Sequence, residues 1–221
     1  KLLPKNSIQK KFLVSSLIME EAITSAQLEG ASTTREVAKK MLEEVGPDKL
    51  SIRAIAEQLG VSATAVYHHF ANKDELLSHL AAQGFAQLES VLGQCQQGID
   101  KKNKMQVISR QYMLFAFEHP AMYQLMFGSQ LAHSEMNPTL STARKNAYAV
   151  VEQCVADVLE KDIQSKEVRS AALAAWSFAH GLASLMIHNV FELPEHISKD
   201  AVIEKALLGF NQLVKVHLDF E

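Results

Sequence analysis

Hydrogen-bonding side chains gather in the short stretch of sequence between Ser62 and Lys73. This stretch offers hydroxyl, phenol, imidazole and ammonium groups, at Ser62, Thr64, Tyr67, His68 and Lys73. A threonine hydroxyl can hydrogen-bond a base edge or touch a thymine methyl, and the other groups suit phosphate oxygens. The small side chains of Ala63 and Ala65 would let a helix backbone lie deep in a DNA major groove. These residue types therefore favour contact with nucleic acid.

The residues around this stretch are spaced as in a helix-turn-helix. Two short helices that cross at a tight turn need a small residue at the contact, a residue tolerant of positive φ, and an aliphatic plug. Ala56, Gly60 and Val66 fit these three places, and we expect Val61 and Phe70 to complete the plug. Each helix that follows begins at a good N-cap, namely Ser51, Ser62 and Asn72. The same spacing also fits a helical corner in an unrelated bundle.

If the motif is a helix-turn-helix, its second helix reads the DNA. We expect Thr64 to contact a base edge, and Tyr67, His68 and Lys73 to contact phosphates. The full set of expected DNA-binding residues is Ser51, Arg53, Ser62, Ala63, Thr64, Ala65, Tyr67, His68 and Lys73. Neighbouring residues on a helix point about 100° apart, so His68 and His69 are not expected to share a metal ion.

The charge balance limits how this chain can bind DNA. The net charge of −3 and a pI near 6.3 exclude a uniformly basic coat for nucleic acid. Between residues 33 and 85, six Lys and Arg stand against seven Asp and Glu. Salt dependence follows the number of phosphates contacted, so we expect a modest dependence and an affinity that relies on dimerisation.

Apolar residues recur at helical spacing along almost the whole chain, and no convincing strand hairpin is present. The sequence therefore predicts an all-α fold, with a three-helix DNA-binding domain followed by a helical domain for ligand binding and dimerisation. The expected boundaries are an N-terminal extension at 1–32, the helix-turn-helix domain at 33–80 and the C-terminal domain at 81–221.

Several classes of protein are not expected. Cys95 and Cys154 lie far apart without a CxxC pair, so we expect reduced thiols and neither a disulfide nor a zinc site. No apolar run reaches 18 residues and no secretory leader is present, which predicts a cytoplasmic protein without a membrane contact. Hydrolase, metalloprotease and nucleotide-binding motifs are missing, so we expect no enzyme, metal or cofactor. The chain begins with Lys1, not Met, and we expect it to derive from a longer product.

Longer stretches resemble a known family. The residues GVS at 60–62, YHHF at 67–70 and NKDEL at 72–76 closely resemble the DNA-binding domain of TetR-family transcriptional regulators. FEHPAMYQLMFG at 117–128, with Trp176, His180 and Gly181, resembles the C-terminal domain of the TetR subgroup named for its W-H-G signature. The resemblance implies a homodimer, usually a repressor, that binds operator DNA. It also implies a small-molecule pocket in the C-terminal helices and a four-helix interface built from the last two helices of each copy.

The middle of the chain is rich in Met and aromatic residues, which fill irregular space and adapt to varied ligands. Taken singly, each of these residues also fits an ordinary core position. With the TetR resemblance, we expect a largely apolar effector pocket formed near Tyr112, Phe115, Met122, Met126, Trp176 and His180. His180 could give the effector one polar contact, or it could be a buried imidazole hydrogen-bonded to a carbonyl.

The N-terminal extension resembles a second family. SSLIMEEAITSAQLEGASTTR at 15–35 looks like the inhibitory helix of Fic proteins, with Ser25, Glu29 and Gly30 at the motif positions. In that family the Glu blocks productive ATP binding at an adenylylation site. The catalytic Fic loop is missing, since His119 and Pro120 are followed by Ala121.

Two functions therefore compete. The first is a ligand-responsive regulator, a repressor that a small apolar effector releases from double-stranded operator DNA. The alternative is an interaction module that docks on or inhibits a Fic adenylyltransferase through its N-terminal helix.

Overall fold

The computed structural model describes residues 7–131, 137–191 and 197–218, and these ranges contain helices and no strand. The predicted all-α fold is confirmed. The chain divides into two compact units, Lys1–Leu80 and Ala81–Glu221. Helix α4 (Lys73–Gln94) begins in the first unit and continues into the second.

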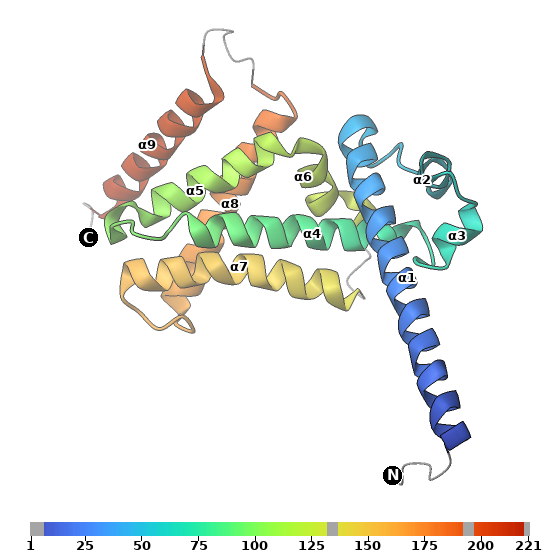
Figure 1. Cartoon of the computed structure of the whole chain (residues 1–221). Coiled ribbons are helices and arrows are strands. Elements are labelled where there is room, and N and C mark those ends of the chain that lie inside the picture. The colour runs from blue at the N-terminus through green and yellow to red at the C-terminus, as the bar shows by residue number, and fades with distance from the viewer. Residues whose placement is uncertain (1–6, 132–136, 192–196, 219–221) are drawn as a thin grey trace. The chain divides into compact units, whose positions relative to one another are not determined.

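The first unit contains α1 (Ser7–Val45), α2 (Ile52–Leu59), α3 (Ala63–Tyr67) and the start of α4. Helix α1 packs against α2, and α2 packs against α3. Helix α1 is continuous through residue 32, so the expected boundary of the N-terminal extension falls inside a helix (Figure 1). Residues 17–29 of α1 are exposed along their whole length, whereas Ala38 and Leu42 are buried.

Local hydrogen bonds fix the helix-turn-helix. Ser51 Oγ accepts a hydrogen bond from Ala54 N at 3.1 Å. The Ser62 hydroxyl and the Asn72 side-chain carbonyl cap the next two helices in the same way, and Gly60 has a φ of 69° at the turn. These three predicted caps and the predicted left-handed turn are confirmed.

The predicted plug of the motif is only partly right. Ala56, Val66 and Phe70 are buried as expected, but 46% of the Val61 side chain is exposed. Val61 N donates to Ala56 O within the turn that ends α2, and α3 begins only at Ala63. Val61 therefore lies outside the buried face of either helix. The prediction that Val61 completes the apolar plug is wrong.

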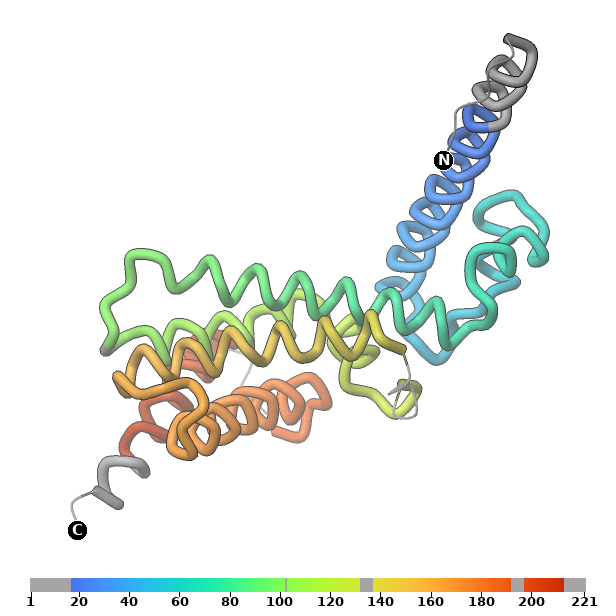
Figure 2. Tube along the Cα trace, turned by 90° about the horizontal axis from the view of Figure 1, so that it is seen from below, coloured from blue at the N-terminus to red at the C-terminus, as the bar shows by residue number. Residues whose placement is uncertain are grey.

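The second unit holds the rest of α4 and a set of further helices. These are α5 (Lys101–Glu118), α6 (Pro120–Phe127), a 3-10 helix η1 (Ser129–Leu131), α7 (Pro138–Leu159), α8 (Lys166–Ile187) and α9 (Lys199–Leu218). Helix α8 packs against α5 and α7, and α5 also packs against α6, α7 and α9. Figure 2 shows the long helices of this unit running beside one another.

Helices α4 and α6 approach closely at Gly84. A Cβ atom at this position would lie 2.7 Å from Met126 Sδ and 2.9 Å from Met122 Sδ. The missing side chain lets the two methionines pack directly against the α4 backbone. The next residue, Phe85, packs edge-on against Phe127 with 5.3 Å between ring centroids.

Helix α8 is long and apolar enough to cross a membrane by length and composition alone. A single helix of this kind is weak evidence for a membrane span, but only 17% of its most apolar window is buried inside this chain. Leu173 on α8 is 60% exposed and Leu208 on α9 is 56% exposed. These helices thus keep apolar side chains that the unit itself does not cover.

Candidate functional site

Helix α3 turns its polar side chains outward. Thr64, Tyr67 and His68 are exposed, while Val66 between them is buried in the first unit. Ala63 and Ala65 are half-buried, so no large side chain stands in front of the backbone at the start of α3. The structure therefore brings Thr64, Tyr67 and His68 together on one accessible surface.

The remaining expected DNA-binding residues have other contacts. The Ser51 and Ser62 hydroxyl oxygens accept the capping hydrogen bonds, although each hydroxyl still has a proton to donate. Arg53 is exposed on α2. Lys73 is half-buried, and its Nζ lies 3.5 Å from the carbonyl oxygen of Pro47 between α1 and α2. Lys73 thus joins the start of α4 to that turn, and it can offer only its other ammonium protons to a phosphate.

His69 lies apart from the exposed surface of α3. A Cβ atom on Gly30 would lie 2.6 Å from His69 Nε2, so the imidazole packs closely on α1. Gly30, one of the Fic-like motif positions, thus has a packing role within this unit. Among the residues the structure describes, no group of three or more His, Cys, Asp or Glu side chains could hold a metal ion.

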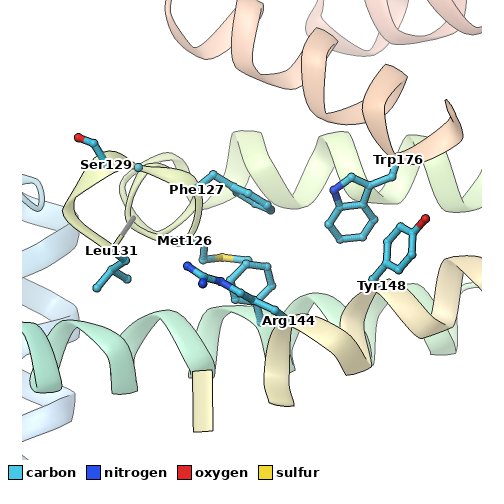
Figure 3. Close-up of a pocket in the computed structure, with 9 residues that line it drawn as sticks. Met126, Phe127, Ser129, Leu131, Arg144, Tyr148 and Trp176 are labelled. Carbon is cyan, nitrogen blue, oxygen red and sulfur yellow. The ribbon is translucent and has the colours of Figure 1, made fainter. Parts of the chain in front are cut away.

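The second unit contains a pocket of about 660 Å³ that lies between helices α4, α6, α7 and α8. Its wall is made of Phe85, Met126, Phe127, Gly128, Ser129, Leu131, Arg144, Tyr148 and Trp176. Figure 3 shows Phe127 and Trp176 pointing toward each other, with Tyr148 beside Trp176 and Arg144 extending toward Met126. A volume of this size is typical of small-molecule sites.

Only part of the expected ligand-binding set lines this pocket. Met126 and Trp176 do, whereas Tyr112, Phe115, Met122 and His180 are not in its wall. Tyr112, Phe115 and Met122 are buried in the core. The sequence reasoning did not single out the aromatic side chains Phe85 and Tyr148 or the charged Arg144. Aromatic residues at Phe85 and Phe127 were visible in the sequence, but nothing in their spacing indicated that they face each other.

His180 joins two tyrosines in a hydrogen-bonded cluster behind the pocket wall. Its Nδ1 lies 2.6 Å from the Tyr123 hydroxyl and 3.2 Å from the Tyr112 hydroxyl, and the two hydroxyls are 3.2 Å apart. Burial raises the pKa of both tyrosines, so both hydroxyls keep their protons. Tyr123 can then donate to Nδ1 and Tyr112 to Tyr123, which places the proton of the neutral imidazole on Nε2. Both roles expected for His180 remain predictions, since this arrangement leaves the Nε2 proton to donate elsewhere.

Aromatic contacts connect this cluster to the pocket. The Trp176 ring packs edge-on against Tyr112 at 4.9 Å and against Tyr148 at 5.5 Å. Phe127 lies 4.6 Å from the His180 ring. Trp176 and His180 are one turn apart on α8, so a single face of this helix supplies both the pocket wall and the cluster behind it.

The half-buried imidazole of His180 should make folding stability sensitive to mild acid. Burial lowers the pKa of His180, so the neutral ring contributes stability above the unfolded-state value of about 6.5. This contribution is lost as the pH falls through the lowered folded-state pKa. We expect the urea midpoint of the wild type to fall more between pH 7.5 and 5.5 than that of His180→Gln, whose amide can still accept from Tyr123. An equal fall in both proteins would contradict this assignment.

A second cavity of about 380 Å³ lies between α5, α7, α8 and α9. Its lining is mostly apolar and includes Met105, Phe178, Leu207 and Phe210. The Phe178 and Phe210 rings stack with 4.2 Å between centroids. Leu207 is only 5% exposed, so it belongs to the interior of this unit.

Two family models match the chain. The model described as bacterial regulatory proteins of the tetR family matches residues 32–80. The model described as the tetracyclin repressor-like C-terminal domain matches residues 105–209. Together the two ranges cover more than half of the chain, and they match the two structural units separately.

Individual proteins show the same similarity. The HTH-type transcriptional regulator Rv0681 of Mycobacterium tuberculosis is 25% identical over 78% of this chain and 76% of its own length. The class A tetracycline repressor of transposon 1721 from Escherichia coli is 48% identical over 50 residues, 23% of each chain. The crystal structure of PfmR, a TetR-family regulator of Thermus thermophilus, has a TM-score of 0.56 and 21% identity, and covers 77% of this chain and 92% of its own. This structure supports the similarity of fold alone.

Proposed function

The chain belongs to the TetR family of bacterial regulatory proteins, and we propose that it is a dimeric repressor that a small molecule releases from operator DNA. The observation that carries this proposal is the surface of α3, where Thr64, Tyr67 and His68 are exposed beside two alanines. Transcriptional regulators are not an enzyme class, and a regulator of this kind acts inside the cell, where its DNA is.

The exposed residues of α3 suggest a division of roles. Thr64 lies in the first turn of α3, between the small Ala63 and Ala65, and would reach base edges in the major groove. Tyr67 and His68 follow at its end and would contact the flanking phosphates. Arg53 is exposed on α2 and adds a charged phosphate contact. Few cations take part, so we propose that high affinity requires two copies bound to one operator.

The exposed apolar side chains of α8 and α9 support a dimer through these helices. Leu173 and Leu185 on α8 and Leu208 on α9 are all exposed. Exposed apolar side chains on these two helices would gain from burial against a second copy. The residue beside Leu208, Leu207, is buried in its own unit and would not serve as an interface probe.

Helix α4 gives a route from the pocket to the DNA-binding unit. Phe85 on α4 forms part of the pocket wall, and the same helix begins at Lys73, next to the helix-turn-helix. A ligand that moves Phe85 would also move α4, because a helix transmits such shifts along its length. We propose that this displacement changes the spacing of the two α3 helices in the dimer.

The proposal is tested by selecting binding sites from a random library of double-stranded DNA with the purified full-length chain. We expect selected fragments to share an inverted repeat whose half-sites lie about one helical turn, roughly 34–36 Å, apart or a multiple of that. Failure to enrich any sequence, or enrichment of sequences without an inverted repeat, would contradict the proposal.

The Fic-related alternative rests on one observation. Ser25 and Glu29 are exposed on α1, as a residue acting on a separate enzyme would have to be. They lie outside the residues matched by the two family models. This alternative would be supported if the whole chain inhibited adenylylation by a purified Fic enzyme and Glu29→Gly removed that inhibition. Loss of operator binding in Glu29→Gly would instead tie this residue to the regulator.

A further inference from the structure

Arg144 is a cation placed in an aromatic pocket. It lies on α7, half-buried, and its guanidinium carbon is 5.8 Å from the centroid of the Phe85 ring. This contact holds the long side chain against the wall through a cation–π interaction. Figure 3 shows the guanidinium extending across the pocket toward Met126.

No carboxylate in the pocket wall balances this charge. The wall residues comprise aromatic, aliphatic and sulfur-containing side chains, one glycine, one serine and Arg144, with neither Asp nor Glu among them. The ion pairs found within residues 7–131, 137–191 and 197–218 do not involve Arg144. The nearest acid along the same helix face is Glu152, which is near Tyr148 and not in the wall. A bound anion would therefore find a guanidinium that the pocket wall leaves unpaired.

The rest of the pocket suits a flat aromatic body. Tyr148 and Trp176 meet edge-on with 5.5 Å between centroids, and Phe127 lies 6.3 Å from Trp176. These rings offer faces and edges to an inserted ring. Ser129 is the only other polar side chain in the wall apart from the Tyr148 hydroxyl and the Trp176 indole.

We propose that this pocket selects aromatic carboxylates, with the carboxylate on Arg144 and the ring between Phe127, Tyr148 and Trp176. A guanidinium can bind a carboxylate through two parallel hydrogen bonds, a geometry that an uncharged ligand does not match as well. The inference deepens the proposed function, because it names the chemical class of the effector. Binding of the carboxylate requires a folded second unit and does not depend on DNA.

The test compares matched pairs of ligands by isothermal titration calorimetry without DNA. The pairs are 3-phenylpropanoate with 3-phenylpropanamide, and 2-naphthoate with 2-naphthamide, which share the ring and replace the charged carboxylate by a neutral amide. We expect the better carboxylate to bind about ten- to a hundredfold more tightly than its amide, as for a hydrogen bond to a charged group. Trp176 is the only tryptophan in the chain, so a change in its fluorescence on adding 3-phenylpropanoate places the ligand in this pocket.

Substitutions on α7 assign the preference to one residue. Arg144→Met should remove the preference for the carboxylate and leave amide binding unchanged, and Arg144→Lys should retain part of it. Lys145→Met is the matched control, since Lys145 is the next residue, is exposed and does not line the pocket. Lys145→Met should keep the full preference. Thermal unfolding followed by circular dichroism checks that each variant is folded.

Equal binding of carboxylate and amide, no binding of either carboxylate at millimolar concentration, or a preference that survives in folded Arg144→Met would overturn this inference. DNA release is then measured separately by fluorescence anisotropy on a selected operator. Carboxylate binding that depends on Arg144 but does not release DNA would support the pocket and contradict the repressor mechanism. Operator binding without any carboxylate preference would support the regulator and overturn the ligand class.

Discussion

Thr64→Glu should abolish specific DNA binding while leaving the chain folded. Thr64 is exposed in the first turn of α3, so the new carboxylate would displace no buried group. On the proposed surface it would face DNA phosphates, and a charge placed against like charge costs several kcal/mol. We expect the affinity of the dimer for operator DNA, measured by fluorescence anisotropy, to fall by more than about a hundredfold. The melting temperature should not change.

The control for this substitution is Thr24→Glu. Thr24 is also an exposed threonine on a helix, and its hydroxyl donates a hydrogen bond to the backbone carbonyl of Glu20 in the exposed part of α1. It adds the same charge away from α3 and should cost less than about tenfold in affinity. Thr64→Val is the milder test, since it should change which base is preferred at one position of each half-site. Equal effects of Thr24→Glu and Thr64→Glu would mean that α3 does not read the DNA.

The helix-turn-helix could be predicted because its determinants are local. A capping serine acts on an amide three residues away, and Gly60 needs only its own backbone angle. Ala56 and Val66 are both buried where α2 packs against α3, so their spacing across a short turn already indicates their places. The exposure of Val61 could not be predicted from local spacing, because the side of a turn that faces solvent depends on where the next helix starts.

The pocket could not be predicted in the same way. Its wall takes Phe85 from α4, Phe127 from α6, Arg144 from α7 and Trp176 from α8. The W-H-G resemblance pointed to Trp176 and His180, but not to the neighbouring helices that place Trp176 in the pocket wall and His180 against the tyrosines. Arg144 lies in a stretch of charged and polar residues that reads as a solvated helix face. Only the packing of α7 against its neighbours places it beside Phe85.

Glutamate at both Leu173 and Leu208 should convert the protein to monomers. These leucines are exposed on α8 and α9, so two glutamates would be accepted by an isolated chain but not by a paired apolar interface. Sedimentation velocity at micromolar concentration should show a dimer for the wild type and a monomer for the variant. Operator affinity should fall by about 10²–10⁴-fold, because each half-site would then be bound independently.

The control is Ile18→Glu with Ile23→Glu, which places two glutamates on similarly exposed apolar positions of α1. That variant should remain a dimer, since the added charge lies on a different helix. A monomeric wild type, or a Leu173 and Leu208 variant that stays dimeric, would contradict an interface through α8 and α9.

Substitutions of the adjacent residues Leu207 and Leu208 on α9 should distinguish a core position from an interface position. Leu207→Glu would bury a charge beside the cavity that contains Phe178 and Phe210, and an unpaired buried charge destabilises the unit itself. Leu208→Glu would leave the charge in water whenever the chain is alone. We therefore expect Leu207→Glu to lower the melting temperature at every protein concentration. Leu208→Glu should lower the melting temperature only at concentrations where the wild type is dimeric. At high dilution the wild type and Leu208→Glu would both unfold as monomers, so their melting temperatures should agree.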